Sequence, residues 1–267
     1  MHRVHSKPPV VLIAMIMLGV LASACTPGKR QKLSRSGAPG QDYLRNDFRC
    51  QTGPVGIEAS ERIMKRYDLL RQEFHKKNVR KGRAFAVIMG DSIAALFHDG
   101  RLKKFLGEFD IANRGIPGDT TPLLQERLVR DGLALRPRFL ILSIGGNDIL
   151  NGRCLSTVLK NTAGILTTVR RLSPGTRVIL ASVPPVLSYK ANSITPFYNR
   201  RLEYLAASHG SRVIFFDLWP HMAEEEAPRL KARYRQELPG GRMDRVHFNE
   251  AGYRRWAELL RPILRGR

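Results

Sequence analysis

Residues 139–148 read FLILSIGGND, and this stretch decides the fold class of the chain. Its first six residues form an almost entirely apolar run, without alternation of polar and apolar side chains. Such a run is typical of a strand buried on both faces, as in a parallel sheet covered by helices. The polar, glycine-rich residues that follow come at the carboxyl end of that strand, where functional groups gather in such sheets.

Other segments repeat this pattern and predict further strands in residues 84–89, 178–183 and 213–216, with a weaker one in 109–112. The stretches between the strands are long enough for crossover helices. We expect helices in residues 92–106, 122–135, 155–172 and 196–208, together with one after Ser60 and one capped by Asn249. The alternation predicts one α/β domain with a mostly parallel, roughly five-stranded sheet.

The composition is that of a folded and strongly basic protein. Its 267 residues include 45 Lys and Arg against 23 Asp and Glu, for a formal net charge of +22. Because 43% of the residues are hydrophobic, there is ample apolar surface for a core, which excludes a disordered or collagen-like chain. Three cysteines are too few for a disulfide scaffold and lack the paired spacing of a zinc site.

Residues 1–24 have the pattern of a secretory signal peptide. Two basic residues precede an apolar run of 15 residues, which is shorter than the roughly 20 residues that span a bilayer. Two cleavage patterns are open at its end: Ala22-Ser23-Ala24 fits simple secretion, whereas Cys25 fits the lipidated first residue of a bacterial lipoprotein. Both predict export to the periplasm or the cell exterior, and lipidation of Cys25 would add a membrane anchor.

Residues 25–57 are predicted to form a flexible leader, and residues 58–267 the folded domain. The first part of this leader contains Pro, Gly, Ser and basic residues but no acid. Export would place Cys50 and Cys154 in an oxidising compartment, where a disulfide between them can form. Two unpaired thiols are the other interpretation, because distance along the sequence does not show whether their Cα atoms come close enough.

Four polar segments come after strands or before the last helix, so we expect them at one edge of the sheet. They are residues 90–92, 113–121, 145–148 and 244–247. Ser92 follows a buried strand and begins a helix, where backbone N–H groups favour developing negative charge. His247, expected in a loop, can remove the proton of the Ser92 hydroxyl, and Asp244 can bond the far nitrogen of its ring.

Acyl chemistry at Ser92 also requires groups that stabilise an oxyanion. The Ser92 amide, the Gly118 amide and the Asn147 side chain can supply three donors, each typically worth a few kcal/mol. Each motif alone has a simpler explanation, as turn residues or as a surface Asp–His pair. Their presence together, in this order and each at its expected element, favours a nucleophile, a base and an oxyanion site.

This ordered set of motifs resembles the SGNH, or GDSL, hydrolase superfamily over about residues 84–264. The first block is present as Gly90-Asp91-Ser92-Ile93, with Ile in place of Leu, and the second block resembles residues 113–121. Gly-x-Asn-Asp matches residues 145–148, and Asp-x-x-His matches residues 244–247. The resemblance implies that the catalytic residues are Ser92, Asp244 and His247, and that Ser92, Gly118 and Asn147 form the oxyanion hole.

The resemblance further implies a flavodoxin-like three-layer α/β/α sandwich with its site at the sheet edge. It implies ester hydrolysis through an acyl-serine intermediate, with neither a metal nor a nucleotide cofactor. An O-acyltransferase with the same catalytic residues is the alternative. A non-catalytic envelope lipoprotein is a further alternative, against which the intact set of motif residues argues.

The substrate is less constrained than the reaction. The positive charge favours anionic envelope glycans or lipids as neighbours, although a bias toward arginine is another explanation, and export argues against nucleic acid. O-acetyl groups on an envelope polysaccharide are one expected substrate, favoured by the short polar loops. Acyl lipids are the other, favoured by the apolar residues Pro184 and Val186, with Tyr189 nearby, which can line an acyl pocket.

Overall fold

The computed structural model describes residues 50–225 and 229–266. The predicted signal peptide, Cys25 and most of the predicted leader therefore lie outside the described residues. Among the helices of the described part of the chain, none combines the length and the apolar character needed to cross a membrane.

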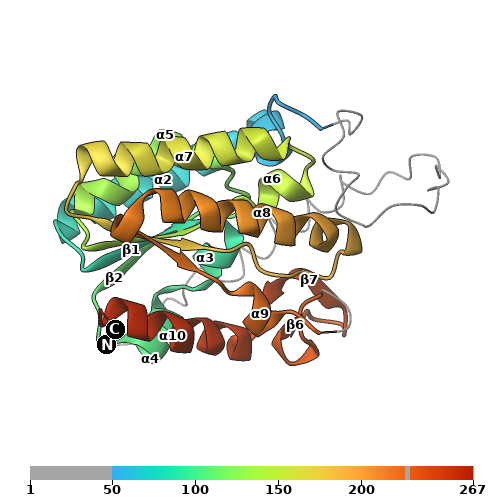
Figure 1. The fold of residues 1–267 in the computed structure, drawn as a ribbon. Helices are drawn as coiled ribbons and strands as arrows, with labels where there is room; N and C mark the ends of the chain where they lie inside the picture. Colours follow the sequence, from blue (N-terminus) through green and yellow to red (C-terminus); the bar gives the residue numbers. More distant parts are fainter. Residues whose placement is uncertain (1–49, 226–228, 267) are drawn as a thin grey trace, which may run out of the picture. The chain divides into compact units, whose positions relative to one another are not determined.

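Five parallel strands form the central sheet, which confirms the predicted α/β class (Figure 1). The strands are β1 (Ala86–Gly90), β2 (Ile111–Gly115), β3 (Phe139–Ser143), β4 (Arg177–Ala181) and β5 (Val213–Phe216). Their order across the sheet is β2-β1-β3-β4-β5, which is the order of flavodoxin-like folds. Gly90 pairs with both Gly115 and Ser143, so β1, β2 and β3 end at the same level.

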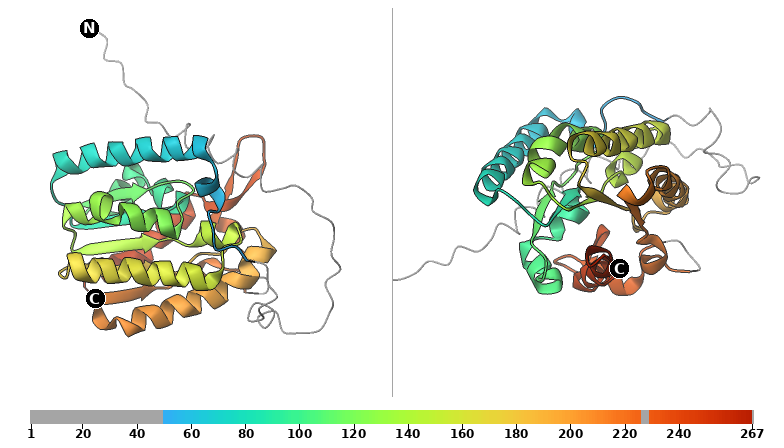
Figure 2. Two further views of the ribbon diagram at one scale, coloured as in Figure 1. Left: turned by 90° about the horizontal axis from the view of Figure 1, so that it is seen from above. Right: turned by 60° about the vertical axis from the view of Figure 1, so that its left-hand side comes forward.

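Helices cover both faces of the sheet and complete the three predicted layers (Figure 2). One layer holds α2 (Glu61–Lys81), α5 (Thr121–Arg127), α7 (Leu155–Leu172) and α8 (Tyr189–Ser208). The other holds α3 (Ser92–Leu96), α4 (Asp99–Leu106), α9 (Trp219–Met222) and α10 (Glu250–Leu264). Alternate residues of β3 belong to two hydrophobic cores, with Leu140 in one and Ile141 in the other. Burial of both faces explains why the strand runs do not alternate.

Two predicted helices are divided in the structure. The stretch 92–106 forms α3 and α4 instead of one helix, because the ring of His98 accepts a hydrogen bond from the N–H of Arg101 and caps a second helix. The stretch 122–135 begins as α5, but the α-helical hydrogen-bonding pattern ends at Arg127. It continues as a π-helical turn, η3 (Leu128–Gly132), and a 3-10 turn, η4 (Leu133–Leu135).

The predicted start of α8 at residue 196 is also wrong. The helix begins at Tyr189, because the hydroxyl of Ser188 accepts a hydrogen bond from the N–H of Ala191 and caps it there. Pro196 lies inside the helix instead of at its first turn.

An antiparallel hairpin of β6 (Arg235–Glu237) and β7 (Met243–Phe248) lies outside the main sheet. The expectation of a loop at Asp244 and His247 is therefore wrong, because both residues lie in β7. The adjacent glycines 240 and 241, which lie between the two strands, are the signal that could have predicted this hairpin.

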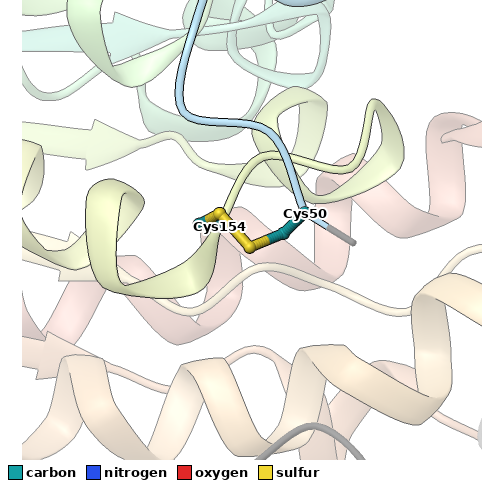
Figure 3. Close-up of a disulfide and its surroundings, with 2 residues drawn as sticks. All are labelled: Cys50 and Cys154. Carbon is teal, nitrogen blue, oxygen red and sulfur yellow. A yellow bond between two sulfur atoms is a disulfide. The ribbon is translucent and has the colours of Figure 1, made fainter. Parts of the chain in front are cut away.

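The described chain begins with a segment that is bonded to the domain. Cys50 and Cys154 form a disulfide with their Cα atoms 4.8 Å apart, so the first of the two cysteine interpretations is the one observed (Figure 3). A short 3-10 helix, η2 (Gly56–Ala59), follows, and its Ile57 is buried. Residues 50–57 were expected in the flexible leader, but this apolar side chain docks them onto the core.

Candidate active site

Ser92 lies where β1 ends and α3 begins. Gly90 ends the strand so close to β3 that a Cβ there would lie 2.0 Å from the carbonyl oxygen of Ser143, and only glycine fits. Asp91 caps α3, since its carboxylate accepts a hydrogen bond from the N–H of Ile93 at 2.9 Å. Burial raises the pKa of Asp91 to about 7. The Ser92 side chain is thereby fixed at the carboxyl edge of the sheet, where the residue is 2% exposed.

The β6–β7 hairpin brings His247 to Ser92, from which it is 155 residues distant in sequence. Nε2 of His247 lies 2.8 Å from Oγ of Ser92. Nδ1 of the same ring lies 2.8 Å from Oδ2 of Asp244. The three residues that the sequence singled out are therefore joined in one hydrogen-bonded chain.

Asp244 is held in its ionised form. Its second carboxylate oxygen accepts hydrogen bonds from the N–H groups of Val246, at 2.8 Å, and His247, at 3.0 Å. Burial acts to raise the pKa of Asp244, but the hydrogen bond and charge attraction of His247 and the two N–H donors together lower it to about 2. A carboxylate at this place can accept the Nδ1 proton and direct Nε2 toward the serine.

The two loops expected to supply oxyanion donors lie side by side. Asn147 is part of α6 (Gly146–Leu150), and its side-chain amide donates to the carbonyl of Asp119 at 2.9 Å. Gly118 precedes Asp119 in the turn after β2 and has a φ of +82°, a conformation that favours glycine. Asn147 also lines the same small cavity as Ser92. Asn147 therefore lies next to both the nucleophile and the Gly118 turn.

Asp148 links these two loops to each other. Its carboxylate accepts hydrogen bonds from the N–H of Thr121 at 3.0 Å and from the hydroxyl of the same residue at 2.9 Å. Nε of Arg153 lies 2.8 Å from Asp148 Oδ1. Burial raises the pKa of Asp148, which has no exposed surface. These contacts hold the start of α5 against α6.

A buried ion pair, which no sequence motif indicated, supports the turn after β2. Arg127 has no exposed surface, and its guanidinium donates to Asp119 Oδ2 at 2.6 Å and to the carbonyls of Arg114, at 2.6 Å, and Gly90, at 3.2 Å. The hydroxyl of Tyr67 donates to the other Asp119 oxygen at 2.9 Å. Burial raises the pKa of Asp119 to about 6, against the lowering effect of Arg127 and Tyr67. One cation thereby ties the ends of β1 and β2 to the Gly118 turn.

A cavity of about 20 Å³ lies beside Ser92. Its apolar lining includes Ile149, Leu150, Val183, Pro184, Val186 and Val246. Pro184 and Val186, two of the residues expected to line an acyl pocket, thus lie beside Ser92. Tyr189 does not line the cavity, and its side chain is 79% exposed.

The arrangement has a defined chemical capability. A serine hydroxyl hydrogen-bonded to an imidazole, which is itself hydrogen-bonded to a carboxylate, can attack a carbonyl carbon with the imidazole as base. Within the part of the chain that the structure describes, no group of three or more His, Cys, Asp or Glu side chains could hold a metal ion. The site is of the serine hydrolase type.

The chain belongs to the GDSL-like lipase/acylhydrolase family, whose family model matches residues 88–255. This match covers more than half of the chain and contains all the residues to which the sequence gave catalytic or oxyanion roles. The protein is accordingly a hydrolase. No curated protein sequence matches the chain.

Several solved structures are similar to this one. A Streptococcus pneumonia protein, provisionally described as a platelet activating factor, is 26% identical with a TM-score of 0.65, over 75% of this chain and 94% of its own. A Bacteroides fragilis protein, provisionally described as an acylhydrolase, is 20% identical with a TM-score of 0.62, over 73% and 95%. A GDSL-like lipase from Bacteroides thetaiotaomicron is 22% identical with a TM-score of 0.61, over 76% and 97%. These similarities show a shared fold.

Proposed function

We propose that the protein is a serine esterase that hydrolyses short-chain carboxylic esters, chiefly O-acetyl groups, through an acyl-serine intermediate. The observation that carries this proposal is the hydrogen-bonded chain from Asp244 through His247 to Ser92, with 2.8 Å at each step. Membership of the GDSL-like lipase/acylhydrolase family supports the reaction class.

Acylation of the serine is the first half of the proposed reaction. Oγ of Ser92 attacks the ester carbonyl carbon while its proton moves to Nε2 of His247. The ionised Asp244 stabilises the imidazolium that forms. The tetrahedral intermediate then loses the alcohol: the ester C–O bond breaks, and the proton on Nε2 passes to the leaving oxygen. Ser92 is left as an acyl ester.

Deacylation repeats these steps with water. Nε2 of His247 takes a proton from a water molecule, whose oxygen attacks the acyl carbon. Breakdown of the second tetrahedral intermediate releases the carboxylic acid and returns the proton to Oγ of Ser92. In both halves of the reaction the negative oxygen accepts hydrogen bonds from the Ser92 amide, the Gly118 amide and the Asn147 side chain. Stabilisation of the oxyanion by such donors is usually the largest single contribution to the rate enhancement at a site of this kind.

The size of the cavity beside Ser92 supports a short acyl group. A single water molecule needs roughly 10–15 Å³ of such space, so a cavity of about 20 Å³ has room for a methyl group, whereas a long alkyl chain would have to extend out of it. The apolar side chains of Val183 and Val186 form part of its wall and fit a methyl group better than a polar one. An acetyl ester therefore fits this structure better than the ester of a long acyl lipid.

The proposed location is the cell envelope, reached through residues 1–24 and with Cys25 as a candidate lipidation site. The disulfide between Cys50 and Cys154 supports export, because such bonds persist in oxidising compartments. Without residues 1–24, which contain Arg3 and Lys7 and no acid, the chain keeps a formal net charge of +20, and this charge favours an anionic neighbour. We therefore propose an O-acetylated acidic glycan of the envelope as the substrate. The mass of the mature N-terminus tests lipidation of Cys25 directly.

The proposal is tested by measuring release of p-nitrophenol from acetyl, butyryl and octanoyl esters by the purified protein. Acetyl is expected to be the best substrate, and Ser92→Ala to lower kcat by at least about a thousandfold. The matched control is Ser156→Ala, since Ser156 is an exposed serine of α7. Equal activity of Ser92→Ala and the wild type would contradict the nucleophile. A preference for octanoyl would contradict the short acyl group, and transfer to an added sugar would indicate an acyltransferase.

A further inference from the structure

Residues 50–58, which we call the N-terminal clasp, pack on the end of one loop that carries a proposed oxyanion donor. The N–H of Gln51 donates to the carbonyl of Gly152 at 2.9 Å, and the carbonyl of Gln51 accepts from the N–H of Cys154 at 2.9 Å. The disulfide between Cys50 and Cys154 closes this pairing covalently (Figure 3). The clasp is thus bonded to the chain that leaves α6, the helix of Asn147.

Ile57 of the clasp contacts the other loop. A Cβ at Gly118 would lie 2.6 Å from Cγ2 of Ile57, so the isoleucine fills the space that a side chain at residue 118 would occupy. Ile57 is itself only 2% exposed. The outer side of the Gly118 turn is therefore packed against the clasp.

Glu58 joins the two loops through its carboxylate. It accepts hydrogen bonds from Nη2 of Arg153 at 2.6 and 2.7 Å and from the hydroxyl of Thr120. The same Arg153 side chain forms the ion pair with Asp148, which accepts from Thr121. The side chains of Glu58 and Arg153 are only 11% and 3% exposed, so water screens their attraction little. Removal of the Arg153 charge would leave Glu58 without a cation, whereas removal of Glu58 would leave Arg153 with Asp148 as its counter-charge but without the contact to the clasp.

The residues that Glu58 and Arg153 hold lie next to both proposed donors in sequence. Thr120 and Thr121 come directly after the Gly118 turn, and Asp148 is the neighbour of Asn147. Oxyanion donors act by being held in place before charge develops on the substrate. Small displacements of such groups lower the rate of the chemical step more than they weaken the binding of the ground-state ester.

We propose that the N-terminal clasp positions the oxyanion donors, with Glu58 as its positioning residue and the disulfide as the bond that keeps it docked. Glu58 acts through Arg153 and Thr120 and touches no reacting atom. The proposal rests on the proposed esterase function, because it concerns the geometry of that site. It also makes turnover sensitive to the redox state of Cys50 and Cys154.

The test compares wild type, Glu58→Ala, Glu58→Gln and the double variant Cys50→Ser, Cys154→Ser on p-nitrophenyl acetate. Active sites are titrated with an organophosphonate, so that kcat refers only to folded molecules. Glu58→Ala and the cysteine double variant are expected to lower kcat about tenfold with KM changed less than twofold. Glu58→Gln keeps an oxygen that can accept from Arg153, and it is expected to recover most of the loss.

Thr176→Val is the matched control. Thr176 is buried, donates to the carbonyl of Pro137 at 2.6 Å, and precedes β4 at the edge of the sheet opposite to Ser92. Its replacement removes a buried hydrogen bond without touching the clasp, and it is expected to lower the melting temperature but not kcat. A wild-type kcat per titrated site in Glu58→Ala and in the cysteine double variant would overturn the proposal, as would a change confined to KM.

Amide hydrogen exchange separates this proposal from the esterase function itself. Faster exchange at residues 116–121 is expected in Glu58→Ala and in the cysteine double variant, but not in Thr176→Val. If the wild type hydrolyses no ester, the esterase function fails, and the exchange measurement alone then decides whether the clasp holds this turn. Exchange unchanged from the wild type in Glu58→Ala would overturn the positioning role.

Discussion

Replacement of Arg127 by methionine removes a completely buried guanidinium and leaves a side chain of similar length. Asp119 then keeps the hydroxyl of Tyr67 and the N–H of Thr120 as hydrogen-bond donors but loses its counter-charge. Loss of one partner of a buried ion pair costs about 3–5 kcal/mol, because the remaining charge is left unpaired away from water. We expect Arg127→Met to lower the free energy of unfolding by this amount at pH 8.

The destabilisation by Arg127→Met should depend on pH, and the direction of this dependence follows from the pKa of Asp119. Burial raises that pKa from the usual 3.8 to about 6 while Arg127 acts to lower it, so removal of Arg127 must raise it further. An acid with a raised folded-state pKa binds its proton more tightly when folded. The protein therefore loses stability as the pH rises from the unfolded-state pKa to the folded-state pKa. In the wild type this loss ends near pH 6, whereas in Arg127→Met it continues to higher pH.

Each further unit by which the pKa of Asp119 rises adds about 1.4 kcal/mol to the cost at alkaline pH. A rise of one unit or more makes the destabilisation by Arg127→Met at least about 1.4 kcal/mol smaller at pH 5 than at pH 8. The measurement is urea unfolding of both proteins at the two pH values with the disulfide intact. Arg127→Lys, which keeps the charge, should lose less at pH 8.

A second variant tests whether Asp119 is the responsible group. In the Arg127→Met background, Asp119→Asn removes the carboxyl that Arg127 contacts most closely, so the difference between pH 5 and pH 8 should shrink. The remainder belongs to Asp131, a second buried carboxyl, which lies 3.8 Å from Nη1 of Arg127 and whose raised pKa Arg127 acts to lower. Equal destabilisation by Arg127→Met at both pH values would refute the reasoning, since it would mean that the buried carboxylate does not need its cation.

Four further outcomes are expected. Asp244→Asn should lower kcat per folded molecule by about a thousandfold or more, and a loss below tenfold would contradict its role. Asn147→Ala should lower kcat on p-nitrophenyl acetate about a hundredfold or more, and an effect on KM alone would count against it as an oxyanion donor. Val186→Ala should widen the cavity and raise the butyryl-to-acetyl rate ratio by up to about tenfold; an unchanged ratio would mean that the acyl group lies elsewhere. Reduction of the Cys50–Cys154 bond, which spans 104 residues, should lower the free energy of unfolding by about 4–5 kcal/mol in the chain-entropy treatment, measurable by urea unfolding with and without dithiothreitol.

The fold and the candidate site could be predicted because both have local signals in the sequence. Strands buried on both faces need apolar side chains at successive positions, so β1, β3 and β4 stand out as unbroken runs. Their carboxyl ends meet at one edge, so the polar residues after them come together whatever their separation in sequence. The rule places Ser92 and Asn147 at this edge, and their roles are inferred from the four motifs taken together and from the resemblance to the hydrolase superfamily. His247 is inferred from its place three residues after Asp244 in the sequence and from the need of a serine nucleophile for a base.

Contacts between distant segments have no such signal. Glu58 and Arg153 are 95 residues apart, and neither lies in a pattern that indicates the other. The polar composition before residue 58 favours a leader, and it conceals the two buried apolar side chains of this segment, Val55 and Ile57. Arg127 is the exception: it follows Leu123 and Leu124 at helical spacing, so its place on the buried face of α5 could have been inferred.

Part of the structural support of the site lies outside the residues that the family model matches. Residues 88–255 contain the nucleophile, the base and the proposed donors. Tyr67, Ile57 and Glu58 all lie before residue 88, yet each contacts the turn that contains Gly118 and Thr120 or its carboxylate Asp119. Two chains can therefore share every motif of the family and still differ in how firmly the oxyanion donors are held. The rate of this enzyme should depend on residues that the family motifs do not include.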